Sequence, residues 1–445
     1  MEDNNKSLIT INASLAKIEK QIVIGEKILF NDVALIFDEA FYLINSKFIK
    51  RNSEMFFFSI KHNTHYLNDR EFKYQAKVKE NYFSAIELFD KIIVKQPYFE
   101  FAYFLRGIAH NKIFEYKKAI SDFSSAISID INFTEAYARR ASIYDEIDED
   151  NLAIRDFGIA ILLDCTNSEY YHQIANVKFK SDQESSIKDY DKAIQLAPNN
   201  IRAYNNRGRT LKSLGKSKQA KMDFELAIDL SNKELLIDPN NEKLYYYRGW
   251  AKNELHLYKY AIIDFAEAIE IDPEYTSAYF SSACAKARIN DYRGAIDDLT
   301  KAIEINPLGK SYYFNRGMYN KKINKIDEAI NDYSKVIEIS PTYSDAFYNR
   351  GIVKYVLKDY FGAIYDYSKA IEFNPNFYNA FYNRANTNMS LKEYQNAIVD
   401  YSRSIEINPT SGAYYYRSKA RYKIEDIEGG LTDYKKYQDL VKEKK

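Results

Sequence analysis

The sequence predicts an all-α fold, a solenoid of stacked antiparallel helix pairs, and three observations support this prediction. Between successive prolines, the apolar residues follow two separate helical patterns. Small and aromatic residues recur at fixed places within each period. A period of about 20 to 50 residues is typical of repeats that bury their apolar faces against their neighbours. Here the period is 34 residues, set by Pro239, Pro273, Pro307, Pro341, Pro375 and Pro409.

The composition argues against several other classes of protein. The 63 Lys and Arg residues balance 63 Asp and Glu residues, so there is no broad basic field to attract nucleic acid or anionic membranes. No stretch reaches the roughly 18 apolar residues of a transmembrane helix, and the N-terminus does not resemble a signal peptide. Cys165 and Cys284 lie too far apart to suggest a disulfide framework. We therefore expect a cytoplasmic protein without a membrane or nucleic-acid partner.

Residues 1–65 lack the repeat but carry a helical pattern. Val33, Phe37, Phe41 and Phe48 share one face of a predicted helix. We expect this segment to cap the open end of the first repeat, because solenoids require terminal units with a polar outer face. A docking element or a dimer contact is the alternative.

The repeats occupy residues 66–444 and form ten to eleven predicted units. The first unit is degenerate in its first helix. The fourth unit lacks one residue near Ser181, and the fifth carries seven extra residues, about two helical turns, which should lengthen its second helix. The predicted units are 66–99, 100–133, 134–167, 168–200, 201–241, 242–275, 276–309, 310–343, 344–377, 378–410 and 411–444.

Small residues mark where the two helices of a unit approach closely, as Gly351 and Ala363 do in the unit 344–377. Aromatic residues such as Tyr367 fill the space beside them. A second Ala and the Pro follow these residues at fixed spacing. With this pattern the unit resembles the tetratricopeptide repeat, and the resemblance covers about 85% of the chain. The resemblance implies a right-handed superhelical solenoid whose first helices line a concave surface that binds peptides or partner helices.

A charged pair also recurs, with an Arg in the first helix and an Asp 16 residues later in the second. In an antiparallel pair whose turn lies midway, two such residues stand at the same height and can meet. We expect an ion-pair ladder that supports the fold, because charges inside a repeat are normally paired. The pairs are Arg106–Asp122, Arg140–Asp156, Arg207–Asp223, Arg248–Asp264, Arg316–Asp332, Arg350–Asp366, Arg384–Asp400 and Arg417–Asp433.

Candidate binding residues are found where the units differ or where polar residues recur beside the Arg. The position after the small residue varies freely and holds the only Trp of the chain. Aromatic residues precede the Arg by two positions, and asparagines precede it by one. An Asn side chain can both donate to and accept from a bound peptide backbone. The predicted peptide-binding residues are Asn206, Trp250, Phe314, Asn315, Tyr348, Asn349, Tyr382 and Asn383.

Two alternatives to this binding role are equally compatible with the pattern. The asparagines could simply be solvated, while the aromatic residues pack between neighbouring first helices. Trp250 could pack sideways against the next first helix, near Tyr279 and Phe280.

No motif predicts catalysis. The 14 glycines form no phosphate-binding loop, and no constellation of His, Cys or carboxylate residues suggests a catalytic, cofactor or metal site. We therefore expect a non-enzymatic scaffold that binds peptide or protein partners. A ligand-sensing regulator whose residues 1–65 bind nucleic acid is the alternative. The sequence indicates neither a particular partner nor an oligomeric state.

Overall fold

The computed structural model describes residues 69–443, and in this range all regular structure is α-helical. The chain divides into two compact bodies between Leu230 and Ser231. The N-terminal body contains α4 (Asp69–Lys95), α5 (Glu100–Lys112), α6 (Tyr116–Ile129), α7 (Thr134–Glu146), α8 (Asp150–Leu163), α9 (Ser168–Lys178), α10 (Gln183–Leu196), α11 (Ile201–Ser213) and the first part of α12 (Ser217–Ile237).

The C-terminal body begins within α12 and continues through six helix pairs. They are α13 (Glu242–Glu254) and α14 (Tyr258–Ile271), α15 (Thr276–Arg288) and α16 (Tyr292–Ile305), α17 (Lys310–Lys322) and α18 (Ile326–Ile339), α19 (Ser344–Val356) and α20 (Tyr360–Phe373), α21 (Tyr378–Ser390) and α22 (Tyr394–Ile407), and α23 (Ser411–Lys423) and α24 (Ile427–Lys442).

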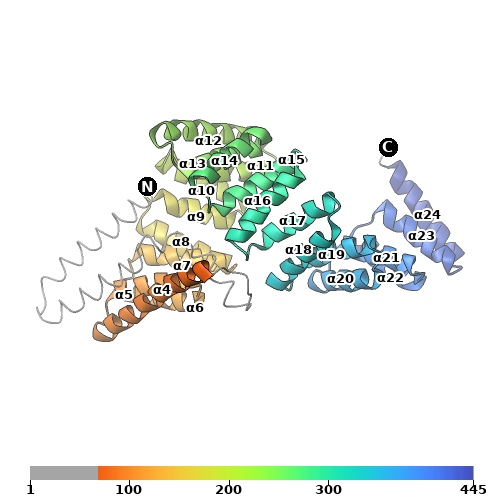
Figure 1. The fold of residues 1–445 in the computed structure, drawn as a ribbon, viewed down its shortest axis with the longest axis horizontal. Coiled ribbons are helices and arrows are strands. Elements are labelled where there is room, and N and C mark those ends of the chain that lie inside the picture. Colours follow the sequence, from red (N-terminus) through yellow and green to blue (C-terminus); the bar gives the residue numbers. More distant parts are fainter. Residues whose placement is uncertain (1–68, 444–445) are drawn as a thin grey trace, which may run out of the picture. The chain divides into compact units, whose positions relative to one another are not determined.

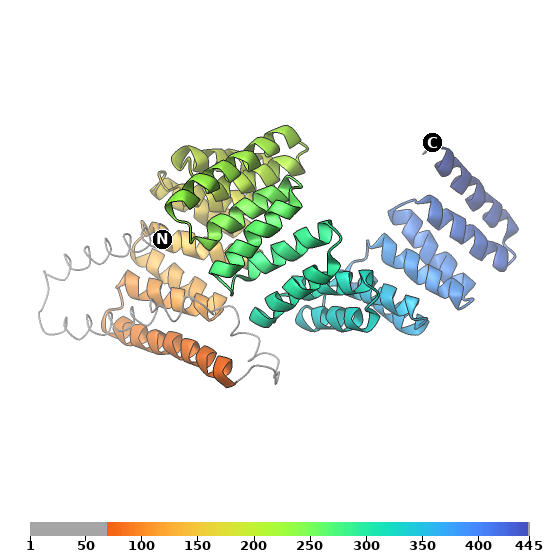
Figure 2. The same ribbon diagram turned by 45° about the horizontal axis from the view of Figure 1, so that its top comes forward.

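Within each body, consecutive helices pack against one another (Figures 1 and 2). Each second helix also packs on the first helix of the next repeat, as α20 does on α21. First helices of neighbouring repeats touch directly, for example α19 and α21. The first helices therefore form one layer of a body and the second helices the other. The predicted all-α arrangement of packed helix pairs is confirmed.

The close approach within a pair depends on the small residue of the first helix. A β-carbon added to Gly351 would lie 2.8 Å from the Tyr367 ring, inside van der Waals contact. Tyr367 is 1% exposed, and the equivalent ring is buried in most other repeats, although Tyr434 of the last repeat is exposed. The glycine thus provides the space into which the ring of the second helix packs.

Most repeats turn between their helices through a residue in the left-handed region. Lys358 has φ of 63°, its N–H donates to the carbonyl of Tyr355, and the N–H of Asp359 donates to that of Lys354. This pattern closes the end of α19 as a C-terminal cap does. Among the described residues, Gly215 is the one glycine with a positive φ. The other described residues with a positive φ are Phe114, Asp148, His256, Asn290, Asn324, Lys358, Lys392 and Glu425.

Two repeats depart from this plan where the sequence departs from the period. In the repeat that lacks one residue, Phe179 stays in the right-handed region after α9, and Asp182 caps α10 by accepting from Ser185. In the next repeat, α12 has 21 residues whereas α10 has 14. The seven extra residues therefore lengthen the second helix, as predicted.

The unit predicted at 66–99 is not a helix pair. Residues Asp69–Lys95 form α4, one continuous helix of 27 residues. Glu80 stands one period before Phe114, the turn residue of the next repeat, but it remains helical. No Gly or Pro interrupts this stretch, so the helix continues. The predicted cap at 1–65 lies outside the described residues.

Candidate binding surface and its framework

The predicted Arg–Asp pairs form in both bodies. In the pair on α19 and α20, Nε of Arg350 donates to Oδ2 of Asp366 at 2.9 Å, and Nη2 donates to Oδ1 at 2.7 Å. Asp366 is fully buried, and Arg350 is partly buried. A two-pronged contact of this kind fixes the height of one helix against the other.

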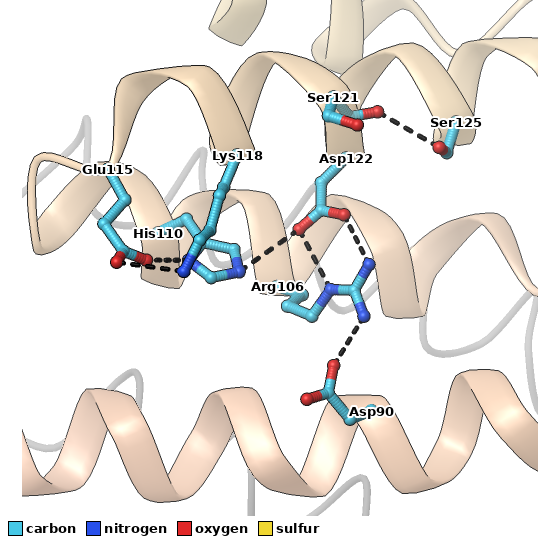
Figure 3. A network of polar contacts seen from close by, with 8 residues as sticks. All are labelled: Asp90, Arg106, His110, Glu115, Lys118, Ser121, Asp122 and Ser125. Carbon is cyan, nitrogen blue, oxygen red and sulfur yellow. Dashed lines mark hydrogen bonds and ion pairs between the residues drawn. The ribbon is translucent and has the colours of Figure 1, made fainter.

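Each of these arginines also reaches the preceding repeat, which the sequence pattern did not reveal. Nη1 of Arg350 donates to the hydroxyl of Ser334 on α18, at 3.0 Å. Nη1 of Arg106 contacts Asp90 on α4, while its other nitrogens hold Asp122 on α6 (Figure 3). We call this arrangement, one Arg with its Asp and the earlier polar residue, the arginine clamp. The earlier residues are Asp90, Ser124, Asp191, Asn232, Thr300, Ser334, Ser368 and Ser402.

The electrostatics of the clamp reflect its burial. Burial by itself lowers the pKa of Arg207, but hydrogen bonds to Asp223 and Asp191 raise it above its ordinary value. Burial raises the pKa of Asp332, and the hydrogen bonds from Arg316 only partly offset this effect. The clamps therefore consist of shielded charges that depend on one another.

A second donor often approaches the same Asp from one helical turn beyond the Arg. Lys354 lies 2.9 Å from Asp366, and Lys252 lies 2.7 Å from Asp264. In two repeats that donor is a neutral amide instead, as with Asn388, which lies 3.3 Å from Asp400.

Two repeats lack the clamp arginine. In each of them, a lysine of the first helix pairs with an aspartate of the second helix instead. Ser282 replaces Arg in the first helix α15, and Lys286 lies 2.7 Å from Asp298 on α16. Ile174 replaces Arg in α9, where Lys178 lies 2.6 Å from Asp189. The second donor position thus substitutes for the clamp, and only the contacts show this.

The predicted aromatic residues of the binding row are half-buried between repeats. The ring of Tyr348 lies 6.0 Å from Tyr367 of its own repeat and 4.7 Å from Phe377, which directly precedes the next first helix, α21. Phe314 contacts Tyr333 and Tyr343 in the same manner, and Tyr382 contacts Tyr401 and Tyr416. These rings therefore contribute to packing, and a role for them in binding stays a prediction.

The predicted asparagines of the C-terminal body are also half-buried. Nδ2 of Asn315 donates to the backbone carbonyl of Ser311 at 2.8 Å, and Nδ2 of Asn349 donates in the same way to Asp345 at 2.9 Å. Nδ2 of Asn383 instead donates to the hydroxyl of Tyr348 on the neighbouring first helix, at 3.1 Å.

These bonds leave acceptor groups available along the row. Oδ1 of Asn315 and Oδ1 of Asn383 accept no hydrogen bond from the described part of the chain. Oδ1 of Asn349 receives only a long contact from Lys321, at 3.4 Å. The row can therefore still accept hydrogen bonds from a bound chain.

Asn206 lies in the N-terminal body, in a different setting. Its Nδ2 is 3.1 Å from Nε2 of His172 and 2.9 Å from Oδ1 of Asn176, both on α9. The hydroxyl of Tyr190 donates to the same Asn176 oxygen at 2.6 Å. Asn206 thus belongs to a polar network between α9 and α11, separate from the row of the C-terminal body.

Trp250 is half-buried at the first-helix layer of the C-terminal body. Together with Tyr246 it packs against a buried cluster of Ala261, Phe265 and Ala285. Ala285 belongs to the next first helix, α15, so the cluster beside the indole includes that helix. The rest of the side chain is accessible to solvent. Both alternatives for Trp250, a binding role and packing near Tyr279 and Phe280, stay predictions.

Comparisons with known families agree with this repeat geometry. Models described as tetratricopeptide repeat match residues 189–222, 276–307 and 378–411, and one described as TPR repeat matches residues 319–358. The chain therefore contains tetratricopeptide repeats. It has no match among curated proteins.

Several solved structures resemble this tetratricopeptide repeat protein. MamA is 28% identical, with 36% of this chain and 94% of MamA covered, at a TM-score of 0.34. YrrB, described as a TPR protein with an unusual peptide-binding site, is 24% identical over 43% of this chain and 95% of its own, with a TM-score of 0.32. Yeast Tom70 is 15% identical over 82% of this chain and 97% of its own, with a TM-score of 0.39.

Neither cysteine of this tetratricopeptide repeat protein belongs to a cluster of metal-ligating side chains among the described residues. Cys165 is exposed, and burial raises the pKa of the half-buried Cys284. Within residues 69–443, no cluster of His, Cys, Asp and Glu could hold a metal ion, and no helix is long and apolar enough to cross a membrane.

Proposed function

We propose that the protein is a non-enzymatic scaffold that binds a peptide or an extended protein segment across the first helices of the C-terminal body. The observation that supports this proposal is the row of Asn315, Asn349 and Asn383. They occupy the same position on α17, α19 and α21, and their side chains retain acceptor oxygens.

The spacing of the row suits an extended chain. Neighbouring packed helices lie about 8 to 10 Å apart. An extended peptide advances about 3.3 to 3.6 Å per residue, so it passes one first helix about every three residues. A peptide crossing α17, α19 and α21 can then donate a backbone N–H to each asparagine in turn.

The half-exposed aromatic side chains beside the row supply apolar contact area. Trp250 and Tyr382 combine a packed edge with an accessible one. Aromatic residues of this kind often contribute most of the energy of an interface. Asn206 is the corresponding candidate in the N-terminal body.

The alternative of a ligand-sensing regulator depends on residues 1–65. These residues lie outside the described part of the chain, and no other observation favours nucleic-acid binding through them. The scaffold is therefore the function that we propose, with the cytoplasm as its expected location.

A selection of random peptides of about twelve residues against the full-length protein tests the proposal. We expect binders whose affinity falls by about 1 kcal/mol for each of Asn349→Ala and Asn383→Ala, the typical value of one hydrogen bond. Asn331→Ala, on an exposed face of the second helix α18, is the matched control and should change nothing. An absence of binders, or binders sensitive only to second-helix substitutions, would contradict it.

A further inference from the structure

The two helix layers of the C-terminal body carry opposite charge, although the whole chain is neutral. Its six first helices hold sixteen Lys and Arg residues and only three Asp and Glu residues. The six second helices are α14, α16, α18, α20, α22 and α24. Together they hold nine Lys and Arg residues and seventeen Asp and Glu residues. The excess of positive charge thus lies on the layer that carries the asparagine row.

The clamps account for only part of this excess. Five arginines pair with the aspartates of their own repeats. Three further cations share such an aspartate, and Lys286 pairs alone with Asp298. Seven first-helix cations make no ion pair with residues 69–443. They are Lys243, Arg288, Lys310, Lys321, Lys322, Lys419 and Lys423.

Lys321 is the most informative of these, because it is partly buried. It lies on α17, and its Nζ approaches Oδ1 of Asn349 on α19 at 3.4 Å. The equivalent position is Tyr355 in α19 and Met389 in α21, and Met389 packs against an apolar cluster. A cation thus replaces apolar side chains at the seam between two first helices.

This placement is costly for the fold unless a charge of opposite sign approaches. Burial and the neighbouring Lys322 lower the pKa of Lys321. The partly buried Lys252, Lys286 and Lys354 each contact an aspartate, whereas Lys321 contacts only a neutral amide. Conflicts of this kind between residue and site are typical of functional positions.

We infer that the segment bound by the first helices of the C-terminal body is acidic, and that one of its carboxylates pairs with Lys321 beside Asn349. This inference rests on the proposed function and specifies the partner. The surrounding unpaired lysines attract the acidic segment, and the paired acidic layer of second helices repels it.

The experiment measures binding of the full-length protein to two synthetic peptides of about ten residues, a length that spans α17 to α21. One alternates glutamate with leucine, and the other carries glutamine in place of every glutamate. We expect the glutamate peptide to bind at least about tenfold more tightly. We also expect its affinity to fall when NaCl is raised from about 0.05 M to 0.5 M, as screening requires.

Two matched variants locate the effect. Lys321→Met introduces the residue that α21 already carries at this position, so the seam should remain packed. It should weaken the glutamate peptide about tenfold and leave the glutamine peptide unchanged. Lys369→Met removes a second-helix lysine that pairs with Glu372 and should alter neither.

Equal affinities for the two peptides, failure of the glutamate peptide to bind, or equal losses in both variants would overturn the inference. Tighter binding of a single-stranded RNA of similar length would also overturn it. If random selection yields binders without acidic residues, the inference fails while the proposed scaffold function stands. If selection yields no binder at all, the proposed function itself fails.

Discussion

At the scale of single residues, the arginine clamp predicts which substitutions destabilise the packing of the helices most. One guanidinium connects three helices, and its Asp is almost completely buried. Removing the arginine leaves a buried charge, which typically destabilises a protein more than the intact pair stabilises it. The loss in free energy of unfolding must then depend on which other donors contact the aspartate.

Two clamps in neighbouring repeats separate these cases. Arg384→Ala leaves Asp400 with the neutral Asn388 and should lower the free energy of unfolding by about 3 to 5 kcal/mol. Arg350→Ala leaves Asp366 with Lys354 at 2.9 Å and should cost about 1.5 to 3 kcal/mol, the value of charge-assisted hydrogen bonds. Chemical denaturation followed by circular dichroism measures both. Equal costs, or a loss below about 1 kcal/mol for Arg384→Ala, would mean that the clamps are not shielded.

Two buried tyrosines make a second residue-scale prediction. The hydroxyl of Tyr401 donates to Asn386 at 2.6 Å, whereas that of Tyr333 has no partner among the described residues. The reason is Met318, which stands where the later repeat has Asn386. The two tyrosines are otherwise equivalent, and both are fully buried.

Removing the two hydroxyls should therefore have different effects. Tyr401→Phe should lower the free energy of unfolding by about 1 kcal/mol, because a hydrogen bond is lost. Tyr333→Phe should leave stability unchanged or raise it by up to about 1 kcal/mol, because an unsatisfied buried group is removed. Equal losses in thermal or chemical melts would refute this difference.

At the scale of helices, the turns show what a repeat period predicts and what it does not. The proline spacing correctly predicts the helix pairs and the lengthened α12. It does not reveal the left-handed residue between the helices, because residues as different as Phe114 and Lys358 occupy that place. The period also does not reveal that Asp69–Lys95 form one continuous helix, because the continuity of α4 depends on local helix propensity around Glu80.

The left-handed turn residues provide a prediction at this scale. A side chain other than glycine is strained in this region, so Lys358→Gly should raise the free energy of unfolding by about 0.5 to 1 kcal/mol despite the greater flexibility of the unfolded chain. Gly215→Ala, with φ of 75° and open space around its α-carbon, should lower it by a similar amount. The same sign for both variants in chemical denaturation would contradict the assigned turn.

At the scale of the whole molecule, the sequence predicts the repeat architecture better than the binding residues. Small residues, aromatic residues and clamp pairs recur, so their roles follow from repetition. The excess of charge on the first helices cancels in the overall composition and becomes visible only when each residue is assigned to a layer. Likewise, only the contacts show that Lys321 is partly buried without a carboxylate and that Tyr348 and Phe314 contribute to packing.

Photo-crosslinking of a selected peptide to the full-length protein tests the central claim most directly, because it locates the bound chain without any substitution. A peptide carrying a photoreactive phenylalanine analogue is irradiated with the protein, and the attached residues are identified by mass spectrometry. We expect crosslinks on α17, α19 and α21, around Asn315, Asn349 and Asn383. Crosslinks confined to α18, α20 and α22, or to the N-terminal body, would contradict the assignment of the binding surface to the first helices of the C-terminal body.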